Sequence, residues 1–346
     1  MDTLDSTLST HRATLLARLA AERGFLLQQL EGLDEPALTH DPVYEGWALP
    51  GLLSHLAYWE AFMADRLAKV ADGRPADIQP LTAADSLADR NEAMRRQFAG
   101  KGFEEALAMA VKERRSLLLA LQRLGDETLE RRIRLRPGWR VAPGLWVRIA
   151  QRHDTEHAAH LVRWRAGYPP NHPSVRVIHR ALLRPLLSLA RQELLAIATL
   201  VAPEARETQP VEGVWTLKQI LGHLSDYDRL GVLALRQLAA GREPAYDAPI
   251  ADFETYNAAR GAAWADVPWA EAWAHYVATR RALLEVAAAL NDELLTRPFT
   301  APWLATTTAC GYLLDMAGHE QEHADALRTL FPYTTLFRSE ERRVGK

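Results

Sequence analysis

The sequence predicts an all-α protein made of two tandem four-helix bundles. Three observations lead to this fold class. The length of 346 residues exceeds the usual size of one domain and favours two. Apolar residues recur at helical spacing, and a shift of 168 residues, which becomes 166 beyond residue 90, places one half of the chain over the other. A repeat this long indicates two complete domains, because solenoid repeats span about 20 to 50 residues.

The first expected helix shows the helical spacing most clearly. Leu15, Leu19, Leu26 and Leu30 are spaced by fours and sevens, so they lie on one face. Strand-like alternation is scarce in both halves. In the first half we expect four main helices, at residues 7–31, 50–71, 84–124 with a break near Gly100 and Gly102, and 143–166.

Prolines, glycines and a threonine mark the expected helix ends. Pro50 and Pro143 suit first-turn positions, and Gly73 suits a C-terminal stop. In the second half, Thr216 is expected to cap the helix that repeats residues 50–71, and Gly241 is expected to end it.

The stretch YPPNHPS separates the two halves, because clustered prolines interrupt helices. The final run, TLFPYTTLFRSEERRVGK, fits neither bundle and looks like a translated sequencing adapter, so we expect that the native C-terminus is lost. The expected organisation is bundle 1 at residues 1–167, a proline-rich linker at 168–182, bundle 2 at 183–330 and a non-native tail at 331–346.

Composition and charge exclude several classes of protein. With 48% hydrophobic and 25% charged residues, the chain is ordinary for a soluble globular protein. A net charge of -3 gives no general attraction to nucleic acid. The N-terminus has no secretion signal, and no apolar run approaches the roughly 18 residues of a membrane span. We therefore expect a cytoplasmic protein with neither nucleic-acid nor membrane partners.

A lone histidine in the second helix of each half and an HxxxH pair in the fourth are the strongest chemical signal. Residues four apart lie on one helical face, so the pair can direct two imidazoles at one point and the lone histidine a third. Three neutral imidazoles with a fourth position left to water are the ligands of a catalytic zinc site. The alternative is a set of helix-interface histidines hydrogen-bonded to carboxylates or carbonyls. The two sets are His55, His153 and His157, and His223, His319 and His323.

At these residues both halves resemble the DinB-like superfamily of bacterial four-helix bundles. The resemblance lies in EGWALPGLLSHLAYWE and RHDTEHAAHLVRW in the first half, and in EGVWTLKQILGHLSDYD and GHEQEHADAL in the second. It implies an up-down-down-up helix order and one divalent metal on each histidine triad. Members include metal-dependent thiol S-transferases, a thiol-dependent maleylpyruvate isomerase and hydrolases that disarm a genotoxin. Many relatives resemble one half and form homodimers, so we expect either a monomer whose tandem bundles replace that dimer or a homodimer.

A glutamate precedes the second histidine of each pair and gives the spelling HxxEH. Around the helix, Glu156 lies about 60° from His153, close enough to border a metal-bound water as a general base. Glu322 is its repeat. Inverzincin proteases share this spelling but need a further carboxylate ligand well downstream, and only 23 residues follow His323. The alternative for each glutamate is a solvated helix face.

Aromatic and basic residues are the expected substrate contacts. Trp59 and Tyr227 follow the second-helix histidines by one turn, and they either wall a pocket or pack in the core. Arg136 and Arg140 lie in the basic segment ERRIRLRPGWRVAPGLWVR before the fourth helix. At the rim of a metal pocket they would favour an anionic ligand, and a solvated basic loop is the alternative.

Four other residues have two interpretations each. His160 is a spare ligand or proton shuttle, or else a second-layer or surface residue. Asn91 and Asn257 line the bundle mouth or serve as caps. Cys310 lies on the helix face opposite His319, so we expect a core residue rather than a thiolate ligand.

These features predict a metal centre that activates a water or thiol for attack on small electrophiles. The resemblance implies a metal-dependent hydrolase or thiol S-transferase in a detoxification-like role. Zinc or nickel is the expected metal, with iron, cobalt, copper and manganese as alternatives, and a low-molecular-weight thiol is a further expected cofactor. The contrasting prediction is a non-catalytic module, in which metals stabilise the bundles or a pocket sequesters a small-molecule ligand. The sequence leaves open whether the protein is an enzyme.

Overall fold

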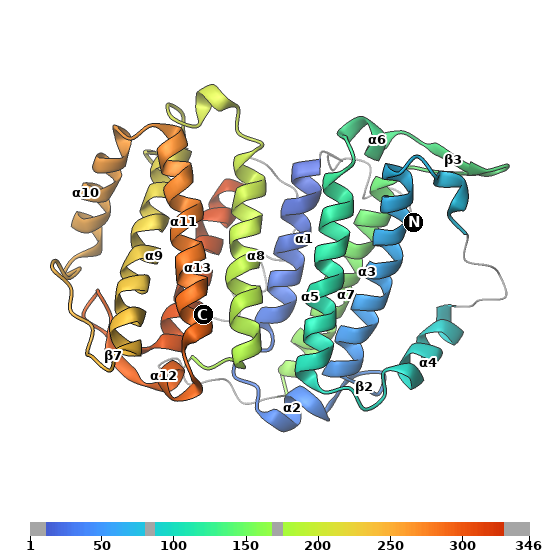
Figure 1. Cartoon of the computed structure of the whole chain (residues 1–346), viewed down its shortest axis with the longest axis horizontal. Coiled ribbons are helices and arrows are strands. Elements are labelled where there is room, and N and C mark those ends of the chain that lie inside the picture. The colour runs from blue at the N-terminus through green and yellow to red at the C-terminus, as the bar shows by residue number, and fades with distance from the viewer. Residues whose placement is uncertain (1–11, 80–86, 168–175, 329–346) are drawn as a thin grey trace. The chain divides into compact units, whose positions relative to one another are not determined.

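A computed structural model of the chain describes residues 12–79, 87–167 and 176–328. The described residues form an all-α fold, as predicted, with strands only in short two-stranded hairpins (Figure 1). The chain divides into two compact units, Met1–Pro170 and Asn171–Lys346. Within the described ranges, no helix is long and apolar enough to cross a membrane. The expected tail at residues 331–346 lies outside the described residues.

Four long helices make up the first unit. They are α1 (Arg12–Gln28), α3 (Leu49–Ala71), α5 (Phe103–Gln122) and α7 (Gly144–Arg165). The shorter elements are α2 (Glu35–Thr39), β1 (Pro42–Tyr44), β2 (Trp47–Ala48), η1 (Pro75–Asp77), α4 (Leu87–Gln97), α6 (Asp126–Glu130), β3 (Ile133–Arg136) and β4 (Trp139–Val141). β1 pairs with β2 and β3 with β4, both antiparallel.

The second unit repeats this plan. Its long helices are α8 (Arg180–Ala198), α9 (Leu217–Ala239), α11 (Trp269–Ala289) and α13 (Ala309–Arg328). Its shorter elements are η2 (Pro203–Ala205), β5 (Pro210–Glu212), β6 (Trp215–Thr216), α10 (Phe253–Ala265), α12 (Asp292–Thr296), β7 (Pro298–Thr300) and β8 (Thr306–Thr308). The antiparallel hairpins are β5 with β6 and β7 with β8.

Contacts at the helix ends of the first unit give the up-down-down-up order. Arg12, at the start of α1, donates to a carbonyl just past the end of α5, so these two helices are antiparallel. Asp72 and Arg123, which directly follow α3 and α5, form an ion pair, so α3 and α5 run in the same direction. Arg165, at the end of α7, donates to a carbonyl just past the end of α1, so α1 and α7 are parallel.

Several helices begin or end where the sequence predicts. Thr216 caps α9, and its side chain and that of Gln219 form a reciprocal capping box. Gly73 and Gly241 follow α3 and α9 with φ of 72°, a left-handed conformation that glycine adopts without a steric penalty. The predicted break near Gly100 separates α4 from α5.

Other details differ from the prediction. The first long helix ends at Gln28 rather than at residue 31, and α8 begins at Arg180, inside the expected linker at 168–182. Residues 168–175 of that linker lie outside the described residues. The hairpins were not predicted, because strands such as β2 and β6, with two residues each, are too short to show alternation.

Each bundle contains a set of four buried charged side chains that pair with one another, one from each long helix. In the first unit, Arg23 of α1 lies 2.6 Å from Glu60 of α3 and 2.8 Å from Asp154 of α7, and Arg114 of α5 pairs with both carboxylates. All four side chains are at most 5% exposed. Two positive and two negative charges balance, which is the form in which ionised groups are tolerated inside a protein. We call this set the charge network of the bundle.

The second unit has an equivalent charge network. It consists of Arg191, Asp228, Arg280 and Glu320, with pairwise N to O distances of 2.7 to 3.0 Å. The hydroxyl of Tyr276 also donates to Glu320. Each member matches its counterpart in the first unit at the repeat offset of 168 or 166 residues. The repeat therefore includes the buried charges as well as the histidines.

We expect Arg114→Leu to lower the free energy of unfolding of the first bundle by about 3 to 5 kcal/mol, because it leaves two buried carboxylates with a single guanidinium. Urea denaturation of the full chain measures this change. The control is Asp65→Asn, which breaks the exposed pair with Lys69 and should cost less than about 1 kcal/mol. Equal effects of the two substitutions would contradict a structural role for the network.

Candidate metal centres

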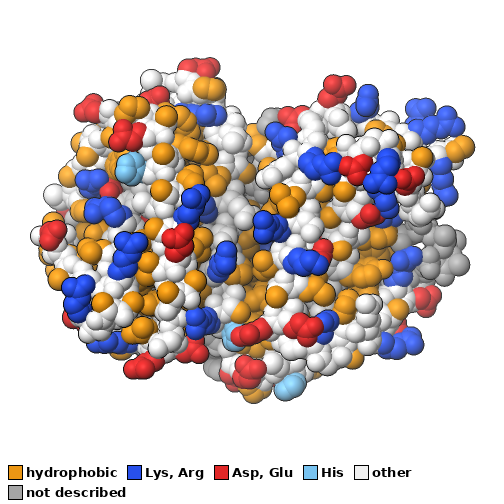
Figure 2. Space-filling model, in the orientation of Figure 1, with side chains coloured by type: hydrophobic (Ala, Val, Ile, Leu, Met, Phe, Trp, Pro, Cys, Tyr) orange, Lys and Arg blue, Asp and Glu red, His pale blue; other side chains and the backbone are white. Residues whose placement is uncertain are grey.

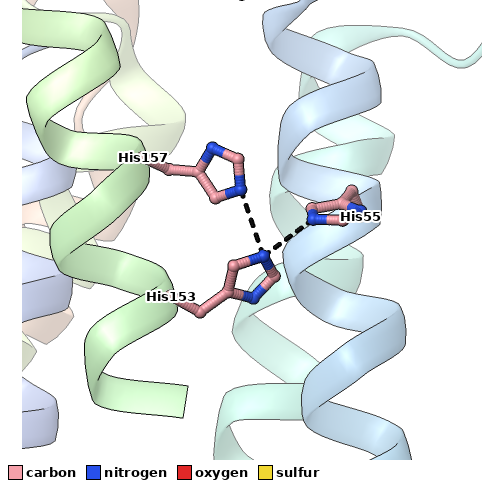
Figure 3. Close-up of side chains that lie close together, drawn as sticks. All are labelled: His55, His153 and His157. Carbon is pink, nitrogen blue, oxygen red and sulfur yellow. Dashed lines mark hydrogen bonds between the residues drawn. The ribbon is translucent and has the colours of Figure 1, made fainter. Parts of the chain in front are cut away.

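The first histidine triad lies between α3 and α7. His55 projects from α3, and His153 and His157 project from successive turns of α7 toward it (Figure 3). The Nε2 atom of His153 lies 2.7 Å from Nε2 of His55 and 3.1 Å from Nε2 of His157. His55 and His157 are buried, and His153 is partly buried. The predicted set of three imidazoles therefore converges on one point.

The second triad has the same geometry between α9 and α13. The Nε2 atom of His319 lies 2.9 Å from Nε2 of His223 and 3.2 Å from Nε2 of His323. As in the first triad, the candidate ligand atoms all lie within 4.8 Å of one another.

Burial keeps the three imidazoles of the first triad neutral, and it acts in the same direction on His223 and His319. It lowers the pKa of His55 to about 4. Burial, aided by the positive charges of neighbouring groups, lowers the pKa of His153 to about 3 and that of His157 to about 2. In the second unit, burial lowers the pKa of His223 to about 3 and holds the pKa of His319 well below its usual value. A neutral imidazole has a lone pair available for a metal.

The geometry fits a metal better than it fits the packing alternative. Packing histidines would direct Nε2 at carboxylates or carbonyls, whereas here the Nε2 atoms face one another. Zn–N bonds of about 2.0 Å place two tetrahedral nitrogen ligands about 3.3 Å apart. The observed separations of 2.7 to 3.2 Å are close to this value. Each triad can supply three ligands to one divalent ion.

A cavity of about 1040 Å³ opens onto the first triad. Of the predicted substrate contacts, Trp59 and Arg136 line it, and Arg140 is not among its lining residues. Three further arginines that the sequence analysis did not single out, Arg66, Arg95 and Arg152, also line it. Basic side chains gather around β3, where Arg136 lies (Figure 2). The cavity is therefore the place where the predicted anionic ligand would bind.

The predicted glutamates lie at the outer side of the triads. Glu156 lines the first cavity, has 58% of its side chain exposed, and lies 3.4 Å from Arg152. Glu322 is exposed on α13. Tyr227 lies against its own triad, with its ring centre 5.0 Å from that of His223 and 4.9 Å from that of His319.

The second histidine of each HxxxH pair directs Nε2 at its triad, and its Nδ1 atom has a different partner in each unit. In the first, Nδ1 of His157 lies 3.3 Å from Nδ1 of His160, whose ring stacks on Tyr44 at 3.6 Å. In the second, Nδ1 of His323 lies 2.6 Å from Glu212 Oε2. His160 thus contacts a triad histidine from outside the triad, which is one of its two predicted roles. The contact of Glu212 with His323 was not predicted from the sequence. The only available signal was that Glu212 stands at the repeat position of Tyr44.

The asparagines and the cysteine complete the predicted set. Asn257 Oδ1 accepts a hydrogen bond of 3.0 Å from the Tyr227 hydroxyl. Asn91 lines the first cavity, and its Oδ1 atom is buried without a hydrogen-bond partner. Cys310 is buried in α13, as expected for a core residue.

Comparison with known proteins gives one match. A model of the DinB superfamily matches residues 7–161 and 186–327, which include all six histidines of the triads. No curated protein and no solved structure matches the chain.

We expect the metal-free protein to lose stability as the pH falls below about 6.5, the ordinary imidazole pKa. In the folded state His55 titrates only near pH 4 and its triad partners lower still. Between these values the unfolded chain binds more protons than the folded one, so the free energy of unfolding decreases as the pH falls. Urea denaturation from about pH 7.5 to 5 measures the slope. A variant with His55, His153 and His157 all changed to Asn should show a shallower slope, and an unchanged slope would contradict the assignment.

Proposed function

The chain belongs to the DinB superfamily, and we propose that it is a metalloprotein with one divalent ion per triad. We further propose that its first centre acts as a metal-dependent hydrolase or thiol S-transferase on small electrophiles. The observation that carries this proposal is the convergence of three neutral imidazole Nε2 atoms at the wall of a 1040 Å³ cavity. A sealed structural site has no need for such a space beside it.

The donor set limits the choice of metal. Three imidazoles without a thiolate suit zinc or nickel, and they also accept cobalt, iron, copper or manganese. When bound, such an ion supplies Lewis acidity that lowers the pKa of a water or thiol to near neutrality. The neutral state of the three imidazoles supports binding at neutral pH, because no proton has to leave before a ligand bond forms.

Other residues of the first cavity have roles that follow from their chemistry. Trp59 and Trp146 wall the cavity with apolar rings that exclude water from a bound electrophile. Glu156, at the exposed side, accepts a proton from the nucleophile and passes it to solvent. Arg136 is held over the Trp139 ring, 5.4 Å from its centre, and presents a positive charge to an anionic substrate group.

Elemental analysis of untagged protein tests the metal assignment. We expect two equivalents of metal per chain, one equivalent in each of His55→Ala and His223→Ala, and none in the double variant, because each triad loses one of its three ligands. Absence of bound metal after reconstitution with zinc or nickel would overturn the proposed function. If the chain binds two metals but converts no electrophile, with either water or a thiol as the nucleophile, the protein is instead a non-catalytic module.

Glu156→Gln tests the proposed proton acceptor. We expect it to lower kcat by about 10²- to 10⁴-fold, the usual contribution of a general base, and to leave the metal content unchanged. The matched control is Glu92→Gln, another carboxylate that lines the cavity. Unchanged turnover in Glu156→Gln would assign this glutamate to the solvated helix face.

A further inference from the structure

We infer that the two metal centres have diverged: the first receives a small anionic ligand from solution, and the second is a closed centre that stabilises its own bundle. The inference rests on the proposed function, because it requires a metal on both triads. It goes further by assigning a different task to each centre and an anionic ligand to the first.

Four arginines and three glutamates line the first cavity, and two of the arginines, Arg95 and Arg152, are paired with glutamates. Arg66 is buried, and its guanidinium donates to the carbonyls of Phe62 and Gln79. Among the described residues, neither Arg66 nor Arg136 forms an ion pair with a carboxylate. An anion in the cavity would supply the missing negative charge.

The repeat equivalents of these two arginines are Ala234 and Pro302, so the second unit has not kept this feature. The positive charge of these two side chains is therefore specific to the first unit.

The asparagine beside each triad is a further difference between the two units. In the second unit, the Tyr227 hydroxyl donates to Asn257 Oδ1. In the first unit Trp59 stands at the position of Tyr227, and the Oδ1 atom of Asn91 is buried without a partner in the cavity wall. Because a buried polar atom without a partner is costly, a donor on a bound ligand would be stabilising here.

Aromatic rings cover the second triad. Tyr227 contacts two of its three histidines, and the buried Tyr312 donates a hydrogen bond of 2.9 Å to the Tyr227 carbonyl. The Tyr312 ring fills the space above Gly231, where an added Cβ would lie 2.5 Å from it, and the Trp303 ring stacks on Tyr312 with ring centres 5.3 Å apart.

The first unit uses the equivalent positions differently. Met63 and Trp146 stand where the second unit has Gly231 and Tyr312, and both of these side chains line the open cavity.

Glu212 gives the second centre a further distinction. Its carboxylate lies 2.6 Å from Nδ1 of His323 and fixes the ring with Nε2 directed at His319. A carboxylate in this position makes a histidine a stronger ligand, and its loss typically weakens metal binding by about 10- to 100-fold. The first triad has His160 there instead. The second centre is therefore the tighter of the two.

The test uses the full chain loaded with two equivalents of Co²⁺, whose visible absorption reports on its ligands. Mercaptoacetate, a small thiol with a carboxylate, is the probe. We expect saturating probe to change about half of the absorption of the wild-type protein, all of it in His223→Ala and none of it in His55→Ala. A change in all of the wild-type absorption, or in none of it, would overturn the inference. Fewer than two bound Co²⁺ ions would instead be a failure of the proposed function.

A chelator competition provides the second readout and does not depend on ligand variants. We expect two phases of Co²⁺ release from the wild-type protein, and Glu212→Gln should weaken only the tighter phase, by about 10- to 100-fold. The exposed Glu204→Gln, in η2 of the same connection between α8 and α9, should change neither. Equal affinities in the wild-type protein, or weakening of both phases by Glu212→Gln, would contradict the closed second centre.

Discussion

The charge network that joins the four long helices of each bundle is the constraint on which the metal centres depend. In the first unit, Asp154 of the network follows His153 directly on α7, and Glu60 lies five residues after His55 on α3. Arg23 and Arg114 hold these two carboxylates together, and so they also fix α3 against α7 at the level of the triad. The triad histidines are therefore positioned by the ion pairs of neighbouring residues on the same helices as well as by apolar packing.

The same arrangement explains why the imidazoles remain neutral. Removing a charge from water is expensive, so a buried histidine keeps its proton only when a negative group lies nearby. The two carboxylates of the network are paired with its own two guanidinium groups. Burial then decides the pKa of His55 and His153, and the result is a set of ligands ready for a cation at neutral pH.

The repeat made much of this predictable from the sequence. Helical spacing, proline and glycine positions and the registered histidines gave the all-α bundles and both triads. The charge networks were not predicted, because a charged helix residue is usually solvated and only the packed fold distinguishes the buried Arg114 from its neighbour Arg115. Glu212 was also missed, since it reaches His323 from a hairpin of very short strands, across 111 residues of chain.

Anomalous X-ray diffraction from crystals of the metal-loaded chain tests the central claim most directly. The account predicts two anomalous peaks per chain at the absorption edge of the bound metal. Each peak should lie about 2.0 to 2.2 Å from three histidine Nε2 atoms, one set being His55, His153 and His157. Peaks at other residues, or triads whose imidazoles remain bonded to one another in metal-loaded protein, would contradict it.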